Sequence, residues 1–205
     1  MKPNPYLIFS RPKSSALRIG PDRLAKYILL LSLFLSPNNS YGQGGTSQAR
    51  IPAVKSVSMA GDTVELPDAL RGKVGVLVLG FSKGSQGQVT TWGRRLAAEW
   101  KDSASVVYYE MPMLAGVPRM LRGMVTRSMK SSIPERAQSR FVPITSDEDA
   151  WRALAHYSKG DDAYVLVVDG EGRVVWQTQG GATDAAFAGV KERVAGLRGA
   201  SEARK

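Results

Sequence analysis

The chain has 205 residues, of which 43% are hydrophobic and 22% are charged, a composition typical of a globular protein. Its 28 Lys and Arg residues outnumber 18 Asp and Glu residues, which gives a formal net charge of +10. Cysteine is absent, so the chain has no disulfide, no thiolate nucleophile and no cysteine–metal site. A single histidine excludes a multi-histidine metal site, and we expect no metal and no cofactor.

Residues 1–42 have the order of a secretory signal peptide. Residues 1–26 are basic, residues 27–36 form a short apolar run, and small residues follow at Ser40–Gly42. The run is about half of what a bilayer-spanning helix needs. We therefore predict a signal peptide at 1–42 and an exported protein, periplasmic or extracellular. An uncleaved anchor and a mitochondrial transit peptide are the lesser alternatives.

The segment after the leader is mildly basic. The leader holds six cations and one acid, so 22 cations and 17 acids remain beyond it. This balance favours acidic partners or an anionic membrane surface. Residues 43–50 are rich in Gly, Ser and Gln and are predicted to be a flexible linker.

The remaining chain alternates predicted strands and helices. In chain order we expect strands at 74–81, 105–109, 140–144, 164–168 and 173–176, and helices at 89–100, 117–130, from Ser146 and from Thr183. Ser146 and Thr183 are the expected helix caps. The pattern predicts an α/β fold with a central, mostly parallel sheet, a C-terminal β-hairpin and helices on both faces. The predicted domain covers 51–198, with a helical insert at about 111–139 and a disordered tail at 199–205.

Two segments resemble the thioredoxin and peroxiredoxin superfamily. Gly72–Phe81, followed by a loop and a helix, is similar to its opening, and 165–176 is similar to its final hairpin. The resemblance implies a thioredoxin-like fold. Redox members keep cysteines in the loop between strand and helix, which here reads Ser82-Lys83-Gly84-Ser85. They also place a proline before the penultimate strand, where this chain has Asp161-Asp162-Ala163. A hydroxyl cannot replace a thiol in disulfide chemistry, so thiol–disulfide and peroxidase activity are excluded.

A narrower resemblance covers nearly all of 70–195. It is carried by the loop that begins at Phe81, by Trp92, and by the segments 128–134, 140–142 and 169–180. In these the chain resembles the mitochondrial ATP synthase assembly factor family, which includes a chaperone for the membrane-embedded subunit a. The resemblance implies a redox-inactive binding protein, non-enzymatic, that acts as a chaperone or assembly factor for a membrane-protein client.

The predicted helical insert is rich in methionine and in basic residues. Five of the seven methionines lie there, at 111, 113, 120, 124 and 129, and Glu135 is the one acid between Met111 and Thr145. Methionine adapts to irregular apolar partners, and flanking cations suit an anionic membrane surface or the ends of a membrane-embedded client. The candidate partner-binding residues are Arg119, Met120, Arg122, Met124, Arg127, Met129, Lys130 and Arg136.

Two interpretations of this insert stay open. An amphipathic helix in an α/β domain usually packs its apolar stripe on the sheet and leaves its cations in solvent. The alternative is that the stripe binds a partner. The basic residues have no aromatic residues between them, which argues against nucleic acid as that partner.

Other functions remain as alternatives. Ser82 or Ser85 could act as the nucleophile of a hydrolase on a peroxiredoxin-like scaffold, although a serine needs a nearby base and His156 is predicted on a different helix. A degenerate domain that only scaffolds a complex is a further alternative. His156 itself is expected to be a partly buried helix residue. Asp147–Asp149 fit the first turn of a helix better than a metal site.

Overall fold

A computed structural model describes residues 49–202, so the predicted signal peptide lies outside the described residues. The strands are β1 (Val54–Val57), β2 (Thr63–Leu66), β3 (Val74–Gly80), β4 (Val106–Pro112), β5 (Ala163–Val168) and β6 (Val174–Gln179). The helices are α2 (Gln86–Trp100), α3 (Arg119–Ser132), α4 (Glu148–Leu154) and α5 (Asp184–Glu202), with the 3-10 turns η1 (Asp68–Leu70) and η2 (Glu135–Arg140).

The main sheet has the strand order β4-β3-β5-β6. β3 pairs with β4 in parallel, whereas β5 is antiparallel to both β3 and β6. The expected hairpin is therefore confirmed, but the sheet is mixed and the prediction of a mostly parallel sheet is wrong. Gly80 pairs with Ala163, so the long segment between β4 and β5 leaves and re-enters at the same end of the sheet. An alternation of strands and helices does not reveal that geometry.

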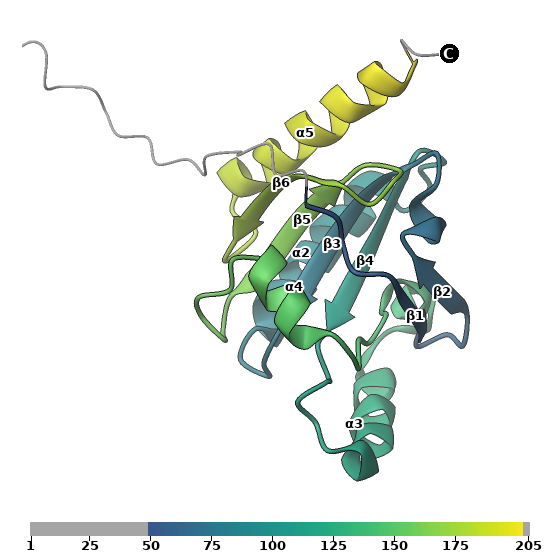
Figure 1. Cartoon of the computed structure of the whole chain (residues 1–205), viewed down its shortest axis with the longest axis vertical. Coiled ribbons are helices and arrows are strands. Elements are labelled where there is room, and N and C mark those ends of the chain that lie inside the picture. Colours follow the sequence, from purple (N-terminus) through teal and green to yellow (C-terminus); the bar gives the residue numbers. More distant parts are fainter. Residues whose placement is uncertain (1–48, 203–205) are drawn as a thin grey trace, which may run out of the picture. The chain divides into compact units, whose positions relative to one another are not determined.

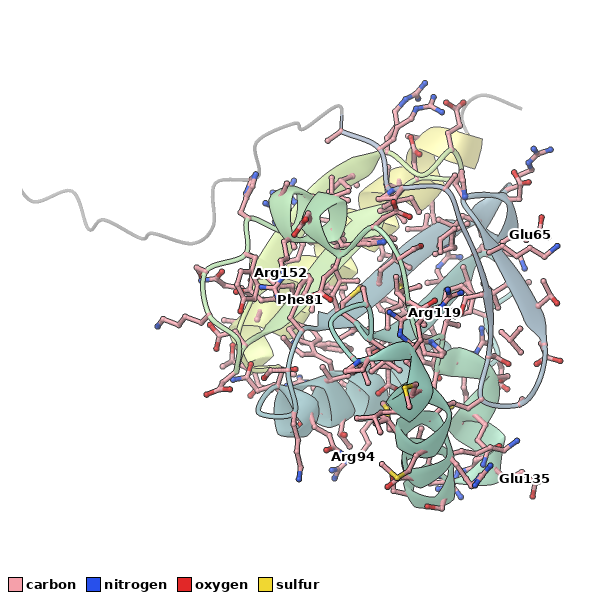
Figure 2. The ribbon with its side chains drawn as sticks, turned by 60° about the horizontal axis from the view of Figure 1, so that its bottom comes forward. Glu65, Phe81, Arg94, Arg119, Glu135 and Arg152 are labelled. Atoms are coloured by element: carbon pink, nitrogen blue, oxygen red, sulfur yellow. The ribbon has the colours of Figure 1, made fainter. Side chains whose placement is uncertain are left out.

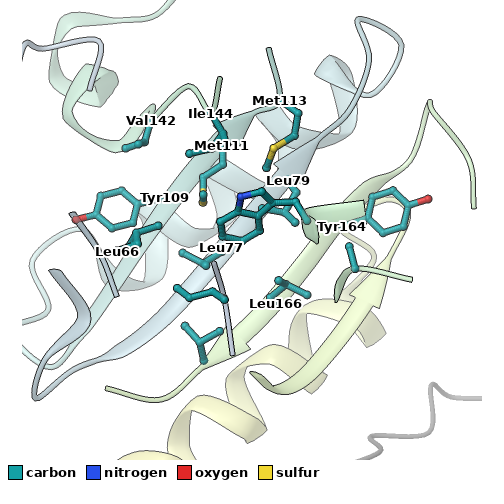
Figure 3. Packing of buried hydrophobic residues seen from close by; sticks show 14 of the residues in the cluster. Leu66, Leu77, Leu79, Tyr109, Met111, Met113, Val142, Ile144, Tyr164 and Leu166 are labelled. Atoms are coloured by element: carbon teal, nitrogen blue, oxygen red, sulfur yellow. The ribbon is translucent and has the colours of Figure 1, made fainter. Parts of the chain in front are cut away.

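Successive residues of β3 face opposite sides of the sheet, and both sides are covered. Val76 and Val78 pack with α2 and α5, whereas Leu77 and Leu79 pack with Trp151 of α4 and with residues of β2. Figure 1 shows these layers, and Figure 3 shows the cluster around Leu77 and Leu79 at close range. Full burial on both faces explains the unbroken apolar run in the sequence.

The tryptophans belong to this core. Trp92 and Trp151 are completely buried and Trp100 and Trp176 nearly so. The indole Nε1 of Trp92 donates a hydrogen bond of 2.9 Å to the carbonyl of Gly180, which ties α2 to the end of β6.

Several predicted boundaries differ from the structure. Residues 140–144 form two isolated bridges rather than a strand, from Phe141 to Glu110 of β4 and from Ile144 to Met113 just beyond it. Ala49 and Arg50 pair with residues 173–174 and are not linker. α5 continues to Glu202, so residues 199–202 are helical and not tail.

One of the two expected caps is confirmed. The hydroxyl of Thr183 accepts a hydrogen bond of 3.2 Å from the backbone N–H of Ala186 at the start of α5. Ser146 is not a cap, because α4 begins later and Asp147, with a positive φ of 56°, precedes it.

Candidate functional site

The loop between β3 and α2 holds its own hydroxyl groups. Ser82 Oγ donates to the carbonyl of Gly160 over 2.8 Å and accepts from the N–H of Gly84 over 3.0 Å. Ser85 is buried, and its Oγ donates to the carbonyl of Ser82 over 2.8 Å. Lys83 is exposed. Both hydroxyls therefore have a backbone carbonyl as acceptor, and Ser82 Oγ also lies 3.3 Å from Oδ1 of Asp161.

A second loop closes over this one. The carboxylate of Asp161 lies directly against Gly84, where an added Cβ would overlap it and force the Asp161 side chain to shift. The amide of Gln88 donates to Asp162 and accepts from the N–H of Ala163 over 2.9 Å. Acids near the first turn of α2 complement its positive end. The helix end that an anionic ligand would use therefore already faces the chain's own carboxylate.

His156 does not assist the serines. It is exposed, lies just past α4 with φ of 49°, and its Nδ1 is hydrogen-bonded to the amide of Gln177. The prediction of a partly buried helix residue is wrong, because α4 has only seven residues and ends at Leu154. Within the described residues the serine–histidine pair that hydrolysis needs is not formed.

An arginine and three aromatic rings support this end of the sheet. The guanidinium carbon of Arg152 lies 3.9 Å from the ring centre of Tyr157 and 5.0 Å from that of Phe81. Phe81 also meets Tyr164 edge to face. Hydrogen bonding to Tyr157, and then the 2.6 Å ion pair with Glu148, raise the pKa of Arg152. Figure 2 shows Phe81 and Arg152 side by side. The cluster is a structural support for the loop.

Helix α3 is the feature that packing does not explain. None of its residues is buried, and Met120, Leu121 and Met124 are 94%, 46% and 62% exposed. They are three of the four large hydrophobic side chains exposed in the described part of the chain. The expectation that the apolar stripe packs on the sheet is therefore wrong for these residues. Val125 and Met129 are half-buried.

The cations of α3 flank these apolar side chains. Arg119, Arg127 and Lys130 are exposed, as is Arg136 in η2. Arg119 stands at the start of α3 in Figure 2. We call Arg119, Met120, Leu121, Met124, Arg127 and Lys130 the α3 surface.

Not every residue of the methionine-rich window belongs to this surface. Met111 and Met113 follow β4 into the core and are almost completely buried. The insert therefore begins after Met113 and not at residue 111. Sequence alone treats all five methionines alike, since their burial depends on where β4 ends.

Arg122 is turned inward and holds α3 in place. Its guanidinium donates to the carbonyls of Ala115 and Val117, each over 2.8 Å, and to that of Thr145 over 3.3 Å. At the other end, the amide of Gln138 donates to the carbonyl of Ile133 over 3.2 Å. The helix is thus positioned through backbone carbonyls, which leaves its apolar face uncommitted.

One buried acid, Glu110, is not among the residues singled out from the sequence. Glu110 of β4 is 4% exposed, its carboxylate packs against Gly93 of α2, and its Oε2 has no hydrogen-bond partner. Burial raises the pKa of Glu110 to about 8, against a smaller lowering by Arg94. A lone acid within the apolar run 106–111 was the available signal.

The described residues hold few other candidate sites. No group of three or more metal-ligating side chains is found among residues 49–202. A depression of about 620 Å³ lies beside the start of α4, lined by residues 115–116 and 147–150. Its best-placed acid, Glu148, already accepts hydrogen bonds from the N–H of Gly116 and from Arg152. In the same range, no helix has the length and apolar content to cross a bilayer.

The mixed four-stranded sheet, the terminal hairpin and the helices on both faces define a thioredoxin-like protein whose redox loop carries serines. Solved structures are similar in fold. The thioredoxin domain of a thiol-disulfide oxidoreductase from Bacteroides vulgatus is 18% identical with a TM-score of 0.50, covering 72% of this chain and 97% of that one. A protein described as thiol:disulfide interchange protein DsbE from Chlorobium tepidum is 15% identical with a TM-score of 0.52, covering 74% and 97%.

A third structure, BsSco of the Sco family of cytochrome c oxidase assembly proteins, is 12% identical with a TM-score of 0.51, covering 78% of this chain and 98% of that one. At these identities the likeness shows the fold alone. No curated protein matches the chain significantly. The family model described as ATP10 protein matches residues 32–197, and the chain belongs to this family of ATP synthase assembly factors. The resemblance drawn from the sequence is confirmed.

We predict that Glu110 makes stability depend on pH. The folded chain keeps this proton up to about pH 8, whereas an unfolded chain releases it near 4.5, so the free energy of unfolding falls as the pH rises through that window. The loss is up to about 4 kcal/mol. The Glu110→Gln variant should not show it. Urea unfolding of both proteins at pH 5 and pH 8.5 measures the difference, and equal slopes with pH would contradict the assignment.

We also predict that Arg122→Met loosens α3 selectively. The variant keeps the length of the side chain but loses three hydrogen bonds to carbonyls. Hydrogen exchange should quicken at residues 119–132 while the core strands β3 and β5 keep their protection. Arg127→Met, an exposed neighbour on the same helix, serves as the control. Unchanged exchange in α3 would show that Arg122 does not hold the helix.

Proposed function

We propose that this protein is a non-enzymatic assembly factor of the ATP synthase that works by binding a membrane-embedded subunit of that enzyme. Membership of the ATP10 family supports the process. The observation that carries action at a membrane is the α3 surface, where apolar side chains are exposed beside exposed cations. Exposed apolar side chains gathered on one element indicate an interaction site.

The loop between β3 and α2 also supports a binding role rather than a catalytic one. Ser82 and Ser85 donate hydrogen bonds to backbone carbonyls, and the carboxylate of Asp161 lies against Gly84, just before α2. With no cysteine in the chain, the thiol that thioredoxin-like enzymes use is missing as well. These features support a fold kept for its shape and surface.

The proposed contact surface is close to the set expected from the sequence. It comprises Arg119, Met120, Leu121, Met124, Arg127 and Lys130, with Met129 and Arg136 at its border. Arg122 is left out, because its donors are engaged within the protein. A membrane-embedded client requires a surface that functions where lipid headgroups meet apolar chains.

Affinity purification tests this function. The tagged full chain is recovered from detergent-solubilised membranes, and we expect a membrane-embedded ATP synthase subunit among the enriched proteins. The Ser82→Ala, Ser85→Ala double variant should support ATP synthase assembly as well as the wild type, once its melting temperature shows that it is folded. Absence of any ATP synthase subunit from the eluate would refute the assembly role. A folded but inactive double variant would point to catalysis.

We further propose that the chain acts in mitochondria, a location that residues 1–42 alone predict only as a lesser alternative to export. Family membership supports this location, and the basic, serine-containing leader is compatible with it. A fluorescent protein fused after residue 48 should reach mitochondria in a eukaryotic host. Entry of the fusion into the secretory pathway would restore the prediction of export.

A further inference from the structure

We propose that the α3 surface binds directly to an anionic phospholipid bilayer, with Met120, Leu121 and Met124 entering the headgroup–acyl boundary and Arg119, Arg127 and Lys130 contacting lipid phosphates. The proposal rests on the proposed function in one respect, because a client embedded in a membrane requires the protein to work at that membrane. It adds that the occupant of the α3 surface is the lipid itself.

The apolar side chains of the α3 surface are exposed and have no packing partner within the described residues. Met120 is 94% exposed and shares a helix face with Met124, four residues further along, while Leu121 borders that face as the i–3 neighbour of Met124. Figure 1 shows α3 standing apart from the sheet, joined to it through the loops at its ends. A projecting helix presents a convex face, which a deformable lipid surface covers more readily than a preformed protein groove does. Methionine and leucine are suited to insertion at the acyl boundary.

Positive charges surround the exposed apolar side chains of α3. Arg119, Arg127 and Lys130 lie on α3 next to the apolar stripe, and α3 itself contains no acid. Their long side chains place the charge beyond their apolar stems, so the stem can lie along lipid while the head reaches a phosphate. A basic polar face beside a face of large apolar side chains is the pattern of an interfacial helix.

The way α3 is held makes this contact feasible without unfolding. Arg122 and Gln138 fasten the helix through backbone carbonyls on the side away from Met120 and Met124. The half-buried Val125 and Met129 lie on that inner side. Nothing in the core has to move for the outer side to meet a bilayer. The helix is already formed, so binding does not have to offset the entropy of folding it.

The absence of cysteine permits a probe at a single site. The thiol introduced by Met120→Cys in the full chain is labelled with an environment-sensitive fluorophore. The chain is then titrated with phosphatidylcholine vesicles, with and without phosphatidylglycerol. A label introduced by Ala98→Cys on the exposed side of α2 is the control position. Because the reporter is local, binding through the leader does not mimic contact by α3.

We expect a blue shift at position 120 with phosphatidylglycerol vesicles, little shift with phosphatidylcholine alone, and no shift at position 98. High salt should weaken the response. Adding Arg119→Glu and Arg127→Glu should raise the vesicle concentration for half the shift at least about 30-fold, since each cation near an anionic leaflet contributes severalfold. The matched reversal Arg193→Glu and Arg198→Glu on exposed α5 should change it far less.

Three results would overturn the proposal. They are no shift at position 120 with either vesicle, equal loss from the α3 and α5 charge reversals, and a shift that appears only with a client protein in detergent. The last result would make the α3 surface a protein-binding site. Co-purification of an ATP synthase subunit without lipid contact would sink this inference and leave the proposed function intact. Lipid contact without co-purification of any such subunit would refute the proposed function and leave this inference intact.

Discussion

The burial of β3 on both faces is the constraint on which the rest of the structure depends. Val76 to Leu79 are completely buried, with alternate side chains committed to α2 and α5 on one side and to α4 on the other. The helices that cover the two faces of β3 are α2, α5 and α4, and α3 is not among them. Helix α3 adds no buried residue to this core. Its exposed side chains are therefore not needed to complete the packing around β3.

Polar contacts help to position α3, beside the half-buried Val125 and Met129. Arg122 satisfies the carbonyls of Ala115 and Val117, and Glu148 accepts from the N–H of Gly116 while pairing with Arg152. These bonds connect the base of α3 to α4 and so to the aromatic cluster at the end of β3. Met120 and Met124 stay in solvent, where burial against a partner is still available as a driving force.

The loop between β3 and α2, which carries cysteines in redox members of the superfamily, is held here by contacts within the chain. Gly84 admits the carboxylate of Asp161, and Gln88 binds the loop on either side of Asp162 and Ala163. The positive end of α2 is thereby used within the chain. The exposed apolar and basic side chains lie instead on α3, the helix after β4.

The sequence alone determined the thioredoxin-like class, the buried strands, the terminal hairpin and the lack of thiol chemistry, because residue type and periodicity are local properties. The basic, methionine-rich insert was also visible in it. Tertiary structure alone decided that β5 is antiparallel to β3 and that Met111 is core while Met120 is exposed. It also decided that Arg122 faces inward and that Oε2 of Glu110 has no hydrogen-bond partner. Each of these depends on which distant residues come to lie beside the side chain, and no spacing along the chain encodes that.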